Sequence, residues 1–311
     1  MGPAVSVVVC TSGRPALLDG CLQALAAQSH PDFEVIVVDN APTDDATEQV
    51  ARRFGVTYVV EPRRGLDNAR NRGLAAATAP IVAYTDDDAL PDPRWLDAVA
   101  AVFCSDGVAV VTGDVVAAEL ATPPQRLFEQ TYRGMSKGPQ PRLHQRASRR
   151  IPYLPARFGT GCNMAFRRHA LEQIGGFDPA LDGGTLSGGG GDLDVLQRLF
   201  EAYLPIAYAP DAVVQHHHRP TTSTLQRQLY DNGRGYSAAM TAAFLRADGR
   251  SRAAVLSWWS AWLVWWFGRR IVLRLARRHD MPLRFVLAEL AGAVSGPPLY
   301  VVARRRARRL R

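Results

Sequence analysis

Two short apolar runs that each end in acidic side chains constrain the fold of this chain more than any other feature. Residues 35–38 lead into Asp39, and residues 80–84 lead into a triplet of carboxylates at positions 86–88. Short apolar runs bounded by polar residues are typical of buried strands. A carboxylate at the end of a buried strand loses hydration at a high cost, and a divalent cation commonly compensates. A solvated acidic turn would explain the triplet alone equally well, so its neighbours decide between the two.

The segments around these runs alternate between strand-like and helix-like patterns. Residues 5–10 form another apolar run, which turn residues separate from apolar side chains at helical spacing in residues 17–25. Later elements are expected in the order helix start at 43–45, strand at 56–60 and helix at about 67–77. Alternating strands and helices predict an α/β fold with a mostly parallel sheet and helices on both faces. Ligands of such sheets bind beyond the carboxyl ends of the strands, where Thr11, Asp39 and the acidic triplet should converge.

Seven short motifs follow one another over most of the chain. They read VSVVVCT (5–11), VIVVDN (35–40), GLDNARNRG (65–73), DDD (86–88), GCNMAFRR (161–168), IGGFD (174–178) and DLD (192–194). In this order they resemble the family 2 glycosyltransferases, which have the GT-A fold. A single Asp-x-Asp is weak evidence, whereas the ordered set is specific. The resemblance implies an enzyme that moves a sugar from a nucleotide-diphosphate sugar to an acceptor hydroxyl.

The resemblance assigns several side chains to the nucleotide. Thr11, Arg14 and Asp39 would hold the nucleoside, with the carboxylate of Asp39 accepting a hydrogen bond from the edge of the base. Arg70 would lie near the nucleoside or the diphosphate, and the alternative for it is a solvated arginine on a surface helix. These residues predict a nucleotide-sugar site at one edge of the sheet.

The acidic triplet and a later histidine run are the predicted metal ligands. By resemblance, Asp86 faces the ribose and Asp88 holds Mn²⁺ or Mg²⁺, which stabilises the charge of the diphosphate leaving group. Asp87, also counted among the donor-binding residues, points the other way because successive side chains of an extended chain alternate. Within the run at 216–218, the spacing after the preceding strand favours His216 as a ligand, and His218 shares its face. A polar loop is the alternative for these histidines.

The general base is expected in a glycine-rich segment. Most of the family reads Glu-Asp-x-Asp here, whereas this chain has Gly191 in the position of the Glu. Asp192 remains as the candidate base, and Asp194 is expected to cap a helix at 195–202. The glycines at 188–191 form either a mobile acceptor loop or a plain linker. One base, one metal and no evident nucleophile favour a single displacement with inversion.

The last 66 residues differ in charge and composition from the rest. Residues 1–245 carry 22 basic and 26 acidic side chains, whereas residues 246–311 carry 15 basic and three acidic ones. The second segment also holds a tryptophan-rich run at 253–267, which is shorter than the roughly 20 residues needed to span a bilayer. We therefore expect a catalytic domain at 1–245 and a helical tail at 246–311. The tail either lies on an anionic membrane near a hydrophobic or lipid-linked acceptor, or packs on the domain or a second subunit.

Localisation follows from weaker signals. The four cysteines lack Cys-x-x-Cys spacing, and we expect no secretory signal, which together favour the cytoplasm. One lysine among 37 basic residues favours a GC-rich bacterial genome. With the basic tail, these features predict a bacterial enzyme bound peripherally to the inner face of the cell membrane.

Other function classes fit less well. The first turn lacks the Gly-x-Gly-x-x-Gly of a dinucleotide-dependent oxidoreductase. A sugar nucleotidyltransferase would carry a lysine soon after its first strand, and Lys137 is the chain's only lysine. An acidic catalytic part and an apolar tail disfavour nucleic-acid binding. A sugar-nucleotide-binding protein with little activity remains an alternative because of Gly191.

Overall fold

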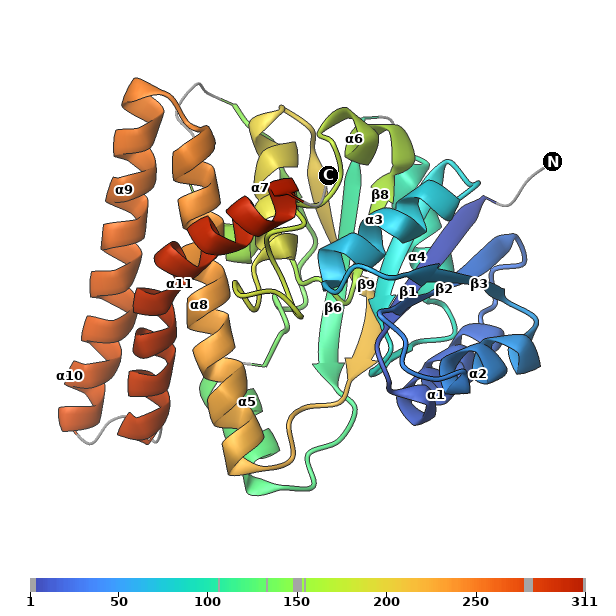
Figure 1. Ribbon diagram of the computed structural model, residues 1–311, viewed down its shortest axis with the longest axis horizontal. Coiled ribbons are helices and arrows are strands. Elements are labelled where there is room, and N and C mark those ends of the chain that lie inside the picture. Colours follow the sequence, from blue (N-terminus) through green and yellow to red (C-terminus); the bar gives the residue numbers. More distant parts are fainter. Residues whose placement is uncertain are drawn as a thin grey trace.

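The computed structural model describes residues 4–105, 107–132, 134–147, 153, 155–276 and 282–309. One sheet flanked by helices forms the part of the molecule on the right in Figure 1, and the C-terminal helices gather on the left. The predicted α/β fold class, with a central sheet between helices and a helical C-terminus, is confirmed. The tail lies against the rest of the chain, along one of its helices.

The N-terminal half of the sheet is parallel. Its strands have the order β3-β2-β1-β4, with bounds β1 Val5–Thr11, β2 Phe33–Asn40, β3 Thr57–Glu61 and β4 Ile81–Asp86. The register pairs Thr11 with Asp39 and Cys10 with Asp86. Three strand ends that the sequence singled out therefore lie side by side at one edge of the sheet.

Antiparallel pairing enters in the second half. Beyond β4 the order is β8-β6-β9-β5, and β7 also pairs with β9; the bounds are β5 Ala89–Pro91, β6 Val110–Ala117, β7 Arg142–His144, β8 Met164–Arg167 and β9 Ile206–His216. β8 is antiparallel to both β4 and β6, whereas β6 and β9 are parallel. β9 ends at His216, which brings this histidine to the edge where β4 ends.

Two apolar cores separate the helices into layers. Alternating side chains of β1 explain the division: Val7 and Val9 face one core and Val8 faces the other, as the period of two in a strand requires. The first core contains α1 (Pro15–Ala26), α2 (Ala46–Phe54) and α4 (Trp95–Phe103), and the second contains α3 (Leu66–Ala76), α6 (Arg168–Gln173) and α7 (Gly191–Glu201). Burial on both faces explains why these strands read as continuous apolar runs.

The C-terminal helices pack against one long helix. The long helix is α8 (Thr222–Arg246), and α5 (Pro123–Tyr132) lies beside it. The helices that follow it are α9 (Gly249–Leu263), the π-helical turn η2 (Val264–Gly268), α10 (Arg269–Leu275) and α11 (Leu283–Arg309). α11 packs so closely on α8 that a Cβ on Gly233 or Gly292 would overlap backbone atoms of the facing helix. A Cβ on Gly190, just before α7, would likewise overlap the backbone of Gly235 in α8. Backbone therefore meets backbone on two sides of α8.

A buried ion pair within the tail also contacts α5. Nη1 of Arg270 lies 2.6 Å from Oε2 of Glu289, and both side chains are buried. The hydroxyl of Tyr132 donates to the same oxygen at 2.7 Å, and Nε1 of Trp266 donates to Oε1 at 2.9 Å. These contacts fully partner a carboxylate that would be costly to bury alone.

α11 is the one helix among the described residues that is long and apolar enough to cross a bilayer, by length and composition. About two fifths of its most apolar window is buried inside the protein, and Pro297 and Pro298 interrupt it. The tryptophan-rich run lies instead in α9 and η2. The predicted domain boundary after residue 245 falls at the end of α8, and it stays a prediction.

Candidate active site

The end of β1 is linked to the acidic triplet by hydrogen bonds. Oγ1 of Thr11 donates to Oδ2 of Asp87 at 2.7 Å, and Arg14 is ion-paired with Asp87 and, at 3.1 Å, with Asp88. Burial raises the pKa of Asp87 to about 7, although Arg14 and Thr11 act in the opposite direction. The structure thus brings Thr11, Arg14 and the triplet together, with Asp87 turned toward β1 rather than toward the cleft.

Asp39 lies at the end of β2 with one oxygen free. The hydroxyl of Tyr58 donates to its Oδ2 at 3.0 Å, whereas its Oδ1 is buried and has no hydrogen-bond partner among the described residues. Burial raises the pKa of Asp39, although the hydroxyls of Tyr58 and Thr47 act in the opposite direction. A buried acceptor with an open position is suited to a ligand that donates a hydrogen bond.

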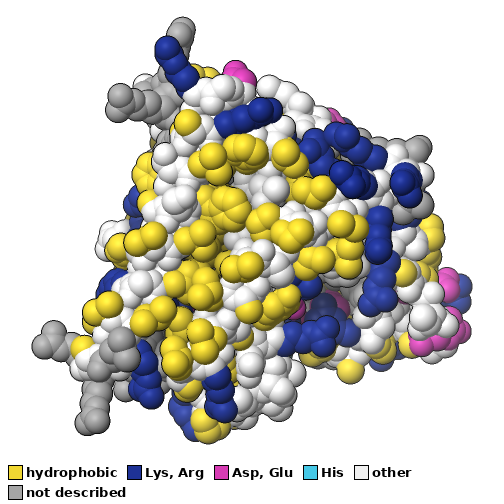
Figure 2. Space-filling view, turned by 60° about the vertical axis from the view of Figure 1, so that its left-hand side comes forward, with side chains coloured by type: hydrophobic (Ala, Val, Ile, Leu, Met, Phe, Trp, Pro, Cys, Tyr) yellow, Lys and Arg dark blue, Asp and Glu magenta, His cyan; other side chains and the backbone are white. Residues whose placement is uncertain are grey.

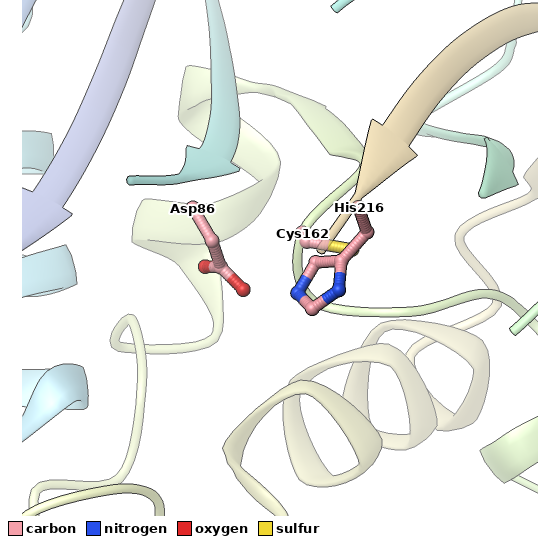
Figure 3. Close-up of side chains that lie close together, drawn as sticks. All are labelled: Asp86, Cys162 and His216. Carbon is pink, nitrogen blue, oxygen red and sulfur yellow. The ribbon is translucent and has the colours of Figure 1, made fainter. Parts of the chain in front are cut away.

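Three different elements bring possible metal ligands together. Asp86 ends β4, Cys162 precedes β8 and His216 ends β9; one ligand atom from each lies within 4.8 Å of the other two. Figure 3 shows Asp86 and His216 facing one another, with the sulfur of Cys162 beside the imidazole ring. Sequence reasoning missed Cys162, because a lone cysteine inside a motif gives no signal by itself.

Asp88 adjoins this cluster through His216. Oδ1 of Asp88 lies 3.2 Å from Nε2 of His216, and its Oδ2 contacts Arg14 and Arg219. Burial raises the pKa of Asp88, but these partners outweigh it and hold the pKa below its ordinary value. Asp88 is therefore an ionised carboxylate already shared among positive groups.

The ring of His218 lies beside that of His216, with centroids 6.1 Å apart, but its Nε2 is turned to α5. Its Nε2 lies 2.9 Å from Oε2 of Glu129, and its ring packs edge-on against Phe128. Both contacts are with α5. Of the two predicted histidines, only His216 lies beside the acidic triplet.

Asp192 lies in the first turn of α7 and faces the loop before β8. Its Oδ2 accepts from the backbone N–H of Gly161 at 2.9 Å, and its Oδ1 accepts from the N–H of Leu193 at 2.8 Å. Burial and the nearby charge of Asp182 raise its pKa, although the positive charge of Arg70 opposes them. A held carboxylate with a raised pKa is suited to proton transfer.

The expectation that Asp194 caps a helix is wrong. The helix begins at Gly191 and its N-cap is Gly190, with a left-handed φ of 95°. Asp194 lies inside the first turn and is ion-paired with Arg198 and Arg246, at 2.7 Å each. The glycine at the cap supplied a conformation that the sequence pattern did not reveal, so the helix begins one turn earlier.

Arg70 is buried rather than solvated, and its partner Asp67 explains the unusual glycine at position 191. It is ion-paired with Asp67, at 2.9 Å, and with Asp182. A Cβ on Gly191 would overlap Oδ2 of Asp67. The carboxylate of Asp67 therefore occupies the space in which a Glu side chain at position 191 would begin. Neither Asp67 nor Asp182 was predicted to lie at the site.

A single cavity of about 1040 Å³ joins these groups to the tail. The predicted residues on its lining are Arg70, Asp86, Asp192 and His216. Five aromatic side chains that contact one another also line it and are called here the aromatic wall: Tyr132, Tyr236, Trp262, Trp265 and Trp266. The sequence-based reading gave the tail tryptophans no part in the site, because an apolar run of this kind is equally consistent with packing or membrane contact.

The sequence pattern described as "Glycosyl transferase family 2" matches residues 6–175, more than half of the chain. The chain belongs to glycosyltransferase family 2. It is therefore a glycosyltransferase, and the predicted family and enzyme class are confirmed.

Curated relatives are glycosyltransferases by name as well. Glycosyltransferase AglE of Haloferax volcanii is 26% identical over 235 residues, which are 73% of this chain and 71% of the relative. The pre-mycofactocin glycosyltransferase of Mycobacterium tuberculosis is 30% identical over 190 residues, 60% of this chain. The aligned part is only 38% of that relative's length.

Solved structures show the same fold. The mannosyltransferase PcManGT from Pyrobaculum calidifontis, in complex with GDP-Man and Mn²⁺, superposes with a TM-score of 0.64 at 20% identity, covering 95% of this chain and 87% of its own. TarS of S. aureus superposes with a TM-score of 0.57 at 18% identity, covering 100% and 92%. The GT-A fold is thereby confirmed.

Proposed function

We propose that this glycosyltransferase moves a sugar from a nucleotide-diphosphate sugar to an acceptor hydroxyl by a single, metal-dependent displacement with inversion. One observation carries the proposal: the cavity that holds Asp86 and His216 also holds Asp192. A metal-side cluster and a base thus lie on one cleft, as transfer between two bound substrates requires.

The donor's nucleoside would lie at the ends of β1 and β2. Asp39 offers its free oxygen to the base, and Thr11 and Arg14 hold the loop that follows β1 through Asp87. Arg70 lies at the cavity between two carboxylates. PcManGT was solved with GDP-Man and TarS with UDP-GlcNAc, which supports a nucleotide-sugar donor without choosing between nucleotides.

The residues at the end of β4 fit a divalent cation. His216 would hold it together with Asp86 and with Asp88, whose Oδ1 lies 3.2 Å from Nε2 of His216, and the thiol of Cys162 lies beside them. Carboxylates suit Mn²⁺ or Mg²⁺, and an imidazole ligand favours Mn²⁺, the transition metal of the two. Such an ion supplies charge stabilisation to the diphosphate as it leaves.

Asp192 would act as the general base. The N–H groups of Gly161 and Leu193 fix the carboxylate, so that it can take the proton of the acceptor hydroxyl as the oxygen attacks the anomeric carbon. The bond to the nucleoside diphosphate breaks in the same step. One displacement from the face opposite the leaving group inverts the anomeric configuration.

The tail would hold the enzyme on the inner face of an anionic membrane. Its outer side is an apolar face whose most exposed side chains are Val264, Trp265, Val272, Leu287 and Val294, between 50% and 74% exposed. Figure 2 shows this face as a broad hydrophobic area with Lys and Arg side chains at its edges. An exposed apolar area with a basic border suits an anionic lipid surface.

Replacement of Asp192 by Asn tests the catalytic proposal. Asn keeps the shape and removes the basicity, so transfer should fall by roughly 10²- to 10⁴-fold, while binding of the nucleotide sugar with Mn²⁺ persists in a thermal-shift assay. Asp211→Asn, on an exposed aspartate of β9, is the matched control. Equal turnover in the two variants would show that Asp192 is not the base.

The same assay addresses the alternative of a binding protein with little activity, which Gly191 favours. Such a protein would bind the donor with Mn²⁺ but neither transfer nor hydrolyse it in the unmodified form. Measurable donor hydrolysis that depends on Asp192 excludes that alternative.

A further inference from the structure

We infer that the aromatic wall of the cavity binds the apolar chain of a lipid-linked acceptor, whose head reaches Asp192 from the exposed side of the tail. This inference rests on the proposed function, because it takes Asp192 as the place where the acceptor reacts. It assigns to the tail a role in substrate binding as well as in attachment.

The cavity extends along α8. Thr224, Arg227, Asp231 and Gly235 line it at spacings of three or four residues, typical of one helix face, and the 12 steps from Thr224 to Tyr236 cover about 18 Å of helix. The Tyr236 end adjoins the catalytic carboxylate, because Gly235 touches the glycine segment that begins α7. An elongated acceptor could therefore lie along α8 with one end at Asp192.

The aromatic wall begins at the same end. The rings of Tyr236 and Trp262 stack with their centroids 4.0 Å apart, and Trp266 lies nearly parallel to Trp262 at 6.5 Å. Nε1 of Trp266 is already bonded to Glu289. With this polar group partnered inside the protein, the ring offers apolar surface to the cavity.

Trp265 connects the cavity with the outer surface. It lines the cavity and is also 58% exposed, next to Val264, which is 74% exposed. The aromatic wall is therefore continuous with the apolar face, and Figure 2 shows a hollow with acidic side chains beside that face. A chain that leaves the cavity at Trp265 would pass directly onto the surface proposed to contact lipid.

This continuity favours a lipid-linked acceptor over a free saccharide. Aromatic rings stack on sugars as well as on acyl or isoprenoid chains, so the wall alone does not distinguish the two. A free saccharide, however, gains nothing from an apolar route to the exterior, whereas each methylene removed from water contributes about 0.8 kcal/mol. The basic residues Lys137 and Arg227 on the lining also suit the phosphate of a lipid-linked head.

Two glucosides that differ only in the length of their chain test this inference on the full chain. Octyl β-glucoside, below its micelle-forming concentration, and methyl β-glucoside are titrated by calorimetry. We expect the octyl compound to bind at least 10-fold more tightly. Trp265→Ala should remove most of that difference, and Trp258→Ala should not, because Trp258 is an exposed tryptophan of the tail that does not line the cavity.

The outcomes separate the possible occupants. Equal binding of the two glucosides would overturn the inference and favour a saccharide on the aromatic wall. Equal losses in Trp265→Ala and Trp258→Ala would also overturn it, because the chain would then bind to the outer face. Thermal stabilisation by nucleotide sugar with Mn²⁺ is measured in parallel, so that a failure of the proposed donor chemistry is recognised separately. Both tryptophans are partly exposed, and unchanged melting temperatures confirm that the variants fold.

Discussion

Two regions that meet at the cavity, the donor side and the tail side, are held together by different forces. The donor side, formed by the ends of β1, β2, β4 and the start of α7, is built from buried carboxylates and arginines, including the pairs of Asp87 with Arg14 and of Asp67 with Arg70. The tail side is built from stacked rings and close helix contacts, with the single buried pair of Arg270 and Glu289.

This difference predicts that the two regions contribute unequally to turnover and to the stability of the fold. Burying a charge costs desolvation energy, and the attraction to its partner offsets that cost only in part. Buried ion pairs therefore fix the positions of side chains more than they stabilise the fold. Close packing of apolar groups adds directly to the stability of the fold. We therefore expect changes on the donor side to affect turnover first and changes on the tail side to affect unfolding first.

The largest effect is expected for Asp88→Ala. Transfer should be abolished, and calorimetric titration of nucleotide should lose its dependence on Mn²⁺. The melting temperature should fall only modestly, because Arg14 and Arg219 are each 40% exposed and regain water. Asp32→Ala, at an exposed loop position, is the control; normal turnover of the Asp88 variant would refute the metal assignment.

Attachment to lipid is the next largest effect. Val264→Glu combined with Val272→Glu places two charges on the apolar face, whose side chains there are 74% and 64% exposed. Flotation with anionic liposomes should be largely lost, while donor hydrolysis continues. High salt should weaken flotation of the unmodified protein only in part, because salt screens arginines but not buried indoles. Full flotation of the double variant would rule out this face.

Gly292→Ala tests the packing of α11 on α8. The added Cβ would overlap the backbone oxygen of Tyr230, and forced overpacking typically costs about 1–3 kcal/mol. Urea unfolding should show this loss, whereas Gly249→Ala, where a Cβ meets nothing within 4 Å, should not. An unchanged midpoint for Gly292→Ala would mean that the tail does not support the fold.

Gly191→Glu restores the residue that most of the family carries and should be harmful here. Its side chain competes with Asp67 for the same space, so stability and transfer should both fall. Asp67→Ser in the same protein should recover part of the loss, and a double-mutant cycle measures this coupling. Additive effects of the two changes would show that the positions are independent.

The smallest effect is a shift in the pH profile. The charge of Asp182 raises the pKa of Asp192, so removing that charge lowers it. Since the base must be deprotonated, the acidic limb of kcat/KM should move to lower pH in Asp182→Asn. Asn also tolerates the left-handed φ of 69° at this position. A limb that stays in place would show that Asp192 does not set it.

The sequence predicted strands β1, β2 and β4, because strands that are buried on both faces consist of continuous apolar runs. It also predicted that Asp39 and the acidic triplet converge, because they follow the ends of such strands. The close contact between the carboxylate of Asp67 and Gly191 could not be predicted, since the two residues are far apart in the sequence and meet only in the folded structure. His218 lies beside His216, as the strand spacing predicted, but its Nε2 contacts Glu129 of α5, a contact that the spacing does not reveal. The tail was ambiguous, because apolar helices pack on protein or lipid by the same force.

The glycine contacts on both sides of α8 have a mechanical consequence. Side chains can change rotamer and absorb a displacement, whereas two backbones in contact cannot. Gly235 contacts the segment that leads into α7, and Gly233, two residues away, contacts α11. We therefore expect a displacement of the tail to pass through α8 to α7, and so to move Asp192, the proposed base.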